Sequence, residues 1–108
     1  DAASFWSGIG AVRRTDFLSV GGFDEAFARP CIEDIEFGTR LLNAGRQIRL
    51  VPEAQGTHAK NWTLSKLWKT DVFDRAIPWA TMIATGQCEP SLNASNKEAF
   101  KAVLAHLV

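Results

Sequence analysis

The chain has 108 residues, with 12 basic and 12 acidic side chains, so its formal net charge is zero. This balance argues against nucleic-acid binding, which usually needs a basic excess. Because 46% of the residues are hydrophobic, a disordered, solvating chain is also excluded. One domain with a modest core is expected at this length. Cys31 and Cys88 form no CxxC motif, so one disulfide and two free thiols both stay open.

The first half of the chain predicts one extended segment and two helices. Residues 3–14, "ASFWSGIGAVRR", are interpreted as extended, with glycines where backbones approach closely. Residues 15–23 predict a short helix that begins at Thr15 and stops at a pair of glycines. Residues 32–45, "IEDIEFGTRLLNAG", predict a helix of about three turns with Phe37 and Leu41 on one face. Gly45 is its C-terminal signal.

The second half predicts one strand and two further helices. Residues 46–52, "RQIRLVP", alternate apolar and polar side chains and predict a strand that ends at Pro52. Residues 63–86 have helical spacing, with Pro78 as a break or kink. The tail, residues 92–108, predicts an amphipathic helix that opens with a capping box at Ser95 and Glu98. Two credible strands against three to four helices predict an α+β fold.

Three acids crowd the start of the helix predicted at residues 32–45: Glu33, Asp34 and Glu36. Acids in a first helical turn are stabilised by the helix macrodipole, each by about 0.3–1 kcal/mol. Taken alone, the cluster is therefore explained by capping. Glu36 and Arg40 stand four residues apart, which predicts a structural ion pair along the helix.

The order of motifs gives the acids a second interpretation. Residues 13–27 contain "RR..FL.VGGFDE.F", and "EDIE", "RL", a glycine, "LVPEA" and His58 follow in turn. Across residues 5–80 this order resembles the C-terminal half of the catalytic domain of inverting family 2 glycosyltransferases, of GT-A fold. The resemblance implies sugar transfer from a nucleotide-diphospho-sugar donor to an acceptor hydroxyl. It also implies a cytoplasmic enzyme of cell-envelope polysaccharide synthesis.

The resemblance assigns the chain to the acceptor side of that enzyme. The first half of the family's α/β fold binds the nucleotide and carries a DxD metal motif, and no DxD is found in this sequence. Residues 1–108 are therefore expected to be a fragment without the nucleotide-binding half, inactive in isolation. Apolar surface exposed by that loss predicts self-association.

The resemblance implies that Asp34 is the general base and that Glu33 beside it binds the acceptor. An aspartate is ionised at neutral pH, and a carboxylate within hydrogen-bond reach of a sugar hydroxyl can take its proton as the new bond forms. His58 matches a histidine that often helps to bind the divalent metal holding the donor diphosphate, Mg²⁺ or Mn²⁺. A purely structural role for His58 stays open.

Trp62 is a candidate for stacking on a sugar face, and the resemblance implies further substrate contacts at Arg75 and Trp79. The last two occur in "DRAIPW", where membrane-bound relatives carry an arginine and a tryptophan near the donor or the acceptor channel. The spacing departs from the QxxRW motif of processive synthases, which argues against processive polymerisation. The tail, residues 92–108, resembles an interfacial helix at the cytoplasmic face of a membrane, and an ordinary core-packing helix is the alternative.

Two other functions compete with the transferase. In a non-enzymatic interaction module, the acids only cap the helix, and backbone groups or arginines satisfy Glu33 and Asp34. In a metal-dependent hydrolase, Asp34 and His58 act together, and further carboxylate or histidine ligands lie close by. The second histidine, His106, sits in the tail and is a poor partner for them.

Overall fold

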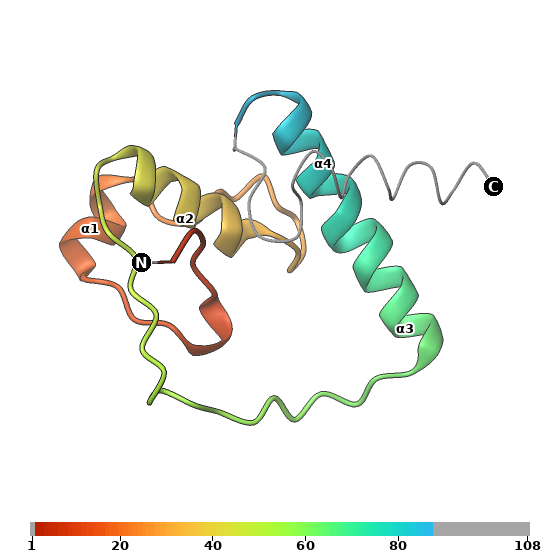
Figure 1. Ribbon diagram of the computed structural model, residues 1–108. Coiled ribbons are helices and arrows are strands. Elements are labelled where there is room, and N and C mark those ends of the chain that lie inside the picture. The colour runs from red at the N-terminus through yellow and green to blue at the C-terminus, as the bar shows by residue number, and fades with distance from the viewer. Residues whose placement is uncertain (1, 88–108) are drawn as a thin grey trace.

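The computed structural model describes residues 2–87, and within that range every regular element is a helix (Figure 1). η1 is a single 3-10 turn and η2 is a π-helical segment. No helix in the described part of the chain is both long and apolar enough to span a membrane. The elements in chain order are η1 (Ser7–Ile9), α1 (Arg14–Ser19), α2 (Glu33–Asn43), α3 (Leu64–Lys69), η2 (Thr70–Ala76) and α4 (Ile77–Ala84).

The predicted α+β fold is wrong, because residues 2–87 contain no β-strand. The segment expected to form a strand, residues 46–52, makes one main-chain bond to the N-terminal segment, from the Ala2 N–H to the Ile48 carbonyl at 2.7 Å. A strand requires a ladder of such bonds with a neighbour. The alternating pattern predicted side chains on two faces, and Ile48 does pack against the core. The alternating pattern does not specify a second strand with which residues 46–52 would pair.

Glycines were predicted to end the helices at residues 15–23 and 32–45, and both predictions are confirmed; Gly86 ends α4 in the same way. Gly21, Gly45 and Gly86 follow α1, α2 and α4 with φ of +83°, +75° and +69°. This left-handed backbone is accessible to glycine without steric cost. After α2, the Gly45 N–H donates to the Leu42 carbonyl at 2.9 Å and the Arg46 N–H to the Leu41 carbonyl at 3.0 Å. Such a Schellman motif satisfies carbonyls that the helix end would leave unpaired.

The buried side chains of helix α2 contribute to two hydrophobic clusters. We call them the N-terminal cluster, which joins α2 to the N-terminal segment and α1, and the α4 cluster, which joins α2 to α4. The N-terminal cluster contains Phe5, Phe37 and Leu41, with Phe17, Val20 and Ile48 packed against it. The α4 cluster contains Ile32, Ile35 and Met82, with Phe27, Cys31 and Trp79 packed against it.

The predicted ion pair between Glu36 and Arg40 is confirmed, with Arg40 Nε 2.6 Å from Glu36 Oε1. The same guanidinium donates to the backbone carbonyls of Val20 and Gly22, beside the Gly21-Gly22 turn. The hydrogen bond to Glu36 raises the pKa of Arg40, and burial opposes that rise only in part. Arg40 therefore fastens the turn after α1 to the face of α2.

Helices α3, η2 and α4 follow one another without interruption from residue 64 to residue 84. The Thr63 hydroxyl accepts from the Lys66 N–H at 3.3 Å and caps the start of α3. Pro78 was predicted to break or kink this helix. The structure keeps the chain helical there, and Pro78 lies in the first turn of α4, directly after the π-helical segment. A wider π-helical turn accommodates a proline that lacks a backbone donor.

Candidate functional site

Asp34 lies in the first turn of α2 and is bound to a segment 27 residues away in the sequence. Its Oδ2 accepts hydrogen bonds from both the N–H and the hydroxyl of Ser7, each at 3.0 Å. Its Oδ1 accepts from the Ile35 N–H at 2.9 Å. Ile32 and Ile35 are buried within the α4 cluster, and their packing holds this turn of the helix in place. The Asp34 carboxylate is therefore held in one orientation.

Glu33 bonds to the backbone just before the helix. Its Oε2 accepts from the Cys31 N–H at 2.6 Å. Both acids thus accept backbone N–H groups, as the interaction-module alternative requires. A carboxylate has about four acceptor sites, so these bonds leave capacity on Glu33 and on Asp34 for a hydroxyl donor. The catalytic and acceptor-binding roles of the pair remain predictions.

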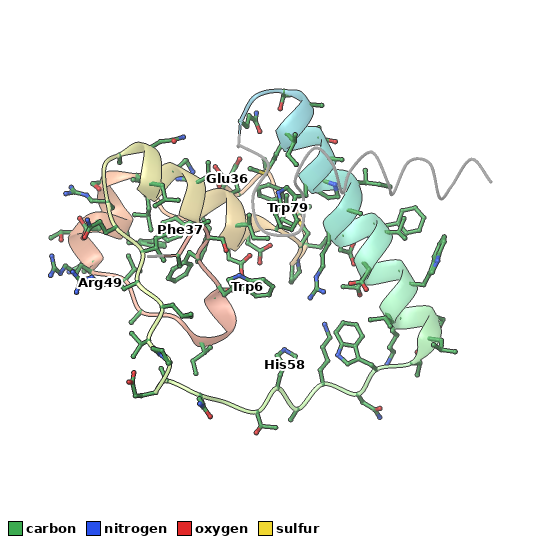
Figure 2. The ribbon with its side chains drawn as sticks, in the orientation of Figure 1. Trp6, Glu36, Phe37, Arg49, His58 and Trp79 are labelled. Carbon is green, nitrogen blue, oxygen red and sulfur yellow. The ribbon has the colours of Figure 1, made fainter. Side chains whose placement is uncertain are left out.

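Trp6 stands beside this carboxylate, immediately before Ser7. Its side chain is 55% exposed, and its indole N–H donates to the hydroxyl of the buried Ser4 at 3.2 Å. Figure 2 shows Trp6 below the first turns of α2. The turn that follows is tight, because a Cβ on Gly10 would lie 2.7 Å from the Trp6 carbonyl oxygen and 2.8 Å from the Phe5 ring. The predicted close backbone approach is therefore confirmed at Gly10 and is wrong at Gly8, where a Cβ would meet nothing within 4 Å.

His58 and Trp62 lie on the irregular segment between α2 and α3. His58 is exposed, and Figure 2 places it apart from α2 and from Trp79. Trp62 is partly exposed, with the Lys60 ammonium 4.3 Å from its ring centroid. Within residues 2–87, no three His, Cys, Asp or Glu side chains gather closely enough to hold a metal ion. The structure therefore does not bring His58 to Asp34, and it gives the hydrolase alternative no ligand cluster.

Arg75 and Trp79 occupy different surroundings although they are close in sequence. Arg75 is exposed and pairs with Asp71 one turn earlier, at 3.0 Å. Trp79 packs against the α4 cluster, between α2 and α4 (Figure 2), and its indole nitrogen is buried with no partner among the described residues. An ion pair from Arg29 to Asp74, at 2.7 Å, joins the loop before α2 to η2.

Comparison with protein families places the chain among the glycosyltransferases. The model described as the N-terminal domain of galactosyltransferase matches residues 1–61, more than half of the chain. The chain belongs to this family. The matched range contains η1, α1, α2, Asp34 and His58, and it ends before Trp62, Arg75 and Trp79. Searches of curated proteins and of solved structures give no match.

The sequence interpretation missed Ser7 as part of the site. No motif in "FWSG" connects a serine to an acid 27 residues later, and only the packing of η1 on α2 brings them together. The predicted interfacial helix, residues 92–108, lies outside the described residues. The glycosyltransferase class predicted from the motif order is confirmed. The match does not show that the chain belongs to family 2, or that it is the C-terminal half of a catalytic domain.

Proposed function

We propose that this chain contributes the acceptor side of an inverting glycosyltransferase that uses a nucleotide-diphospho-sugar donor. The observation that carries the proposal is Asp34, held by three hydrogen bonds at the start of α2 inside the region that matches the family. The acceptor hydroxyl gives its proton to the Asp34 carboxylate. Its oxygen then bonds to the anomeric carbon of the donor as the bond to the diphosphate breaks, and a single displacement inverts that carbon.

Other side chains would contact the substrates in this proposal. Glu33 stands next to Asp34 and would bind an acceptor hydroxyl, on a carbohydrate or a lipid-linked sugar. Trp62 offers an exposed ring face for a sugar. Arg75 would bind donor phosphate, for which it would exchange its exposed pair with Asp71. Trp79 supports the site from the core side, and its buried indole N–H is a free donor among the described groups.

The proposed enzyme requires Mg²⁺ or Mn²⁺, which would neutralise charge on the leaving diphosphate. The described residues do not themselves form a metal site, because His58 is exposed and has no further ligands gathered around it. His58 would therefore supply one ligand at most, and Mn²⁺ accepts imidazole more readily than Mg²⁺ does.

The first test measures sugar transfer and donor binding by the complete natural protein, with the 108-residue chain alone as a comparison. Because the family is named for galactosyl transfer, UDP-galactose is the first donor to test, and UDP-glucose and UDP-N-acetylglucosamine follow. We expect transfer by the complete protein, its loss in EDTA and its recovery with Mn²⁺. The short chain alone should be inactive. His58→Ala should weaken Mn²⁺-dependent donor binding, measured by calorimetry, more than acceptor binding.

Equal donor affinity with and without Mn²⁺ would contradict the metal proposal. If His58→Ala leaves Mn²⁺-dependent donor binding unchanged, His58 has a structural role. Absence of transfer from every donor in the complete protein would contradict the transferase proposal. The interaction module is the second candidate, because backbone N–H groups occupy both acids. It predicts a binding partner and no turnover.

We also propose that the 108-residue chain self-associates. Leu50 and Leu64 are 77% and 87% exposed, and Trp68 is exposed as well. A hollow of about 770 Å³, lined in part by Ile9, Leu50 and Val51, opens beside the N-terminal segment. Leu64 and Trp68 lie one turn apart on α3, and neighbouring exposed apolar side chains of this kind favour association. Sedimentation velocity should show dimers or larger species at raised protein concentration, and a strictly monomeric profile would contradict this prediction.

The cellular setting follows from the resemblance alone. We propose that the enzyme works at the cytoplasmic face of the membrane, where residues 92–108 bind the lipid surface, in the synthesis of a cell-envelope polysaccharide. Fractionation of cells expressing the complete protein tests this proposal. Recovery in the soluble fraction only, with and without residues 92–108, would contradict it.

A further inference from the structure

Ser7 gives two donors to one oxygen of Asp34. The backbone N–H and the hydroxyl both lie 3.0 Å from Oδ2. An ionised carboxylate only accepts hydrogen bonds, so the serine hydroxyl is the donor. At 3.0 Å the hydroxyl bond is at the long end of the O–H···O range, so its role here is to orient the carboxylate. With the Ile35 N–H on Oδ1, both oxygens of Asp34 are fixed and the plane of the carboxylate is set.

The turn that carries Ser7 is itself immobilised against α2. Phe5, two residues earlier, is buried in the N-terminal cluster, and its ring meets the Phe37 ring edge-on at 5.4 Å. Gly38 allows α2 to approach closely, because a Cβ there would lie 2.6 Å from the Phe5 backbone nitrogen. A Cβ on Gly10 would collide with the other end of the turn. Ser7 is therefore a rigid support, positioned by the core.

We propose that Ser7 is a positioning residue for the base, an inference that rests on the proposed role of Asp34. Ser7 holds Oδ2 so that the remaining lone pairs of the carboxylate face the acceptor hydroxyl. Ser7 contacts the base through Oδ2 and takes no part in the proton transfer itself. A displacement of about 1 Å in a reacting group can cost roughly 10²-fold in rate, so the hydroxyl of Ser7 matters for turnover although it takes no proton.

A kinetic double-mutant cycle tests this inference in the complete protein. Ser7→Ala should lower kcat by roughly 10-fold to 10²-fold, with little change in the acceptor KM. Ser7→Thr keeps the hydroxyl and should restore most of the turnover. In an Asp34→Asn background, Ser7→Ala should cause almost no further loss, because residues that act as one unit are not additive. Ser19→Ala is the matched control, since the Ser19 hydroxyl bonds only to the Asp16 carbonyl on α1.

The outcomes separate the two proposals. If Asp34→Asn is inactive but Ser7→Ala keeps normal turnover, or lowers it equally in both backgrounds, Ser7 does not position the base. If Asp34→Asn keeps its turnover, the base assignment fails and this inference fails with it. Melting temperatures of all variants are measured in parallel. If Ser7→Ala folds poorly, Ser7→Cys replaces it, because a thiol of similar size donates only weakly.

Discussion

Asp34→Asn is expected to lower turnover by about 10²–10⁴-fold, the usual loss when general acid–base catalysis is removed. Asparagine keeps the size of the side chain and one carbonyl oxygen, which can still accept from Ser7 or from the Ile35 N–H. Asp34 is the second residue of α2, after the N-cap Ile32, so a neutral side chain there gives up only the macrodipole contribution of about 0.3–1 kcal/mol. A purely structural Asp34 therefore predicts a small change in stability and near-normal turnover. Steady-state kinetics and a melting curve on the same sample distinguish the two roles.

Two companion variants sharpen this test. Glu33→Gln should lower acceptor affinity more than turnover, because Glu33 is proposed to bind the acceptor and not to take its proton. Glu53→Gln is the control, since Glu53 is an exposed acid on the irregular segment between α2 and α3. Turnover of Asp34→Asn within a few-fold of the parent, at an unchanged melting temperature, would mean that the acids only stabilise the start of α2.

The helices could be predicted because their signals are local. A first-turn acid cluster, an apolar spacing of three to four and a terminal glycine all act within one element, and α2 formed where they indicated. The ion pair between Glu36 and Arg40 lies within one helix turn and was found for the same reason. The hydrogen bonds from Arg40 to the Val20 and Gly22 carbonyls join different elements, and no local sequence pattern predicts them.

The strand predicted at residues 46–52 is absent because strand formation depends on more than a local signal. Alternation in residues 46–52 describes which side chains point together, and Ile48 does face the core. A strand also needs a neighbour, and the neighbour is a property of the whole fold. The site divides in the same way. Asp34 was identified from a motif, whereas the contact with Ser7 exists only because Phe5 and Gly38 bring η1 onto α2.

The core beneath the site supports the second large prediction, a severe loss of stability in Phe37→Ala. Phe37 is 0% exposed, and its ring centroid lies 5.4, 5.3 and 5.1 Å from those of Phe5, Phe17 and Phe23. Truncating a buried phenylalanine to alanine costs about 3–5 kcal/mol. Domains have a total stability of about 5–15 kcal/mol, so this single change removes a large part of it. The loss should appear as a lower midpoint in urea unfolding followed by circular dichroism.

Phe73→Ala is the control for Phe37→Ala, because Phe73 is 46% exposed and its ring lies in an edge arrangement with that of Trp68, 5.9 Å between centroids. Exposed substitutions usually change stability by about 0.5 kcal/mol or less. Equal midpoints for the two variants would show that the four-phenylalanine contact is not the centre of the core.

Phe37→Leu adds a link to function. It keeps much of the buried volume but removes the edge-on contact with Phe5, two residues before Ser7. If the core positions the base, Phe37→Leu should lower turnover by a larger factor than its modest loss of stability explains, and this excess should vanish in an Asp34→Asn background.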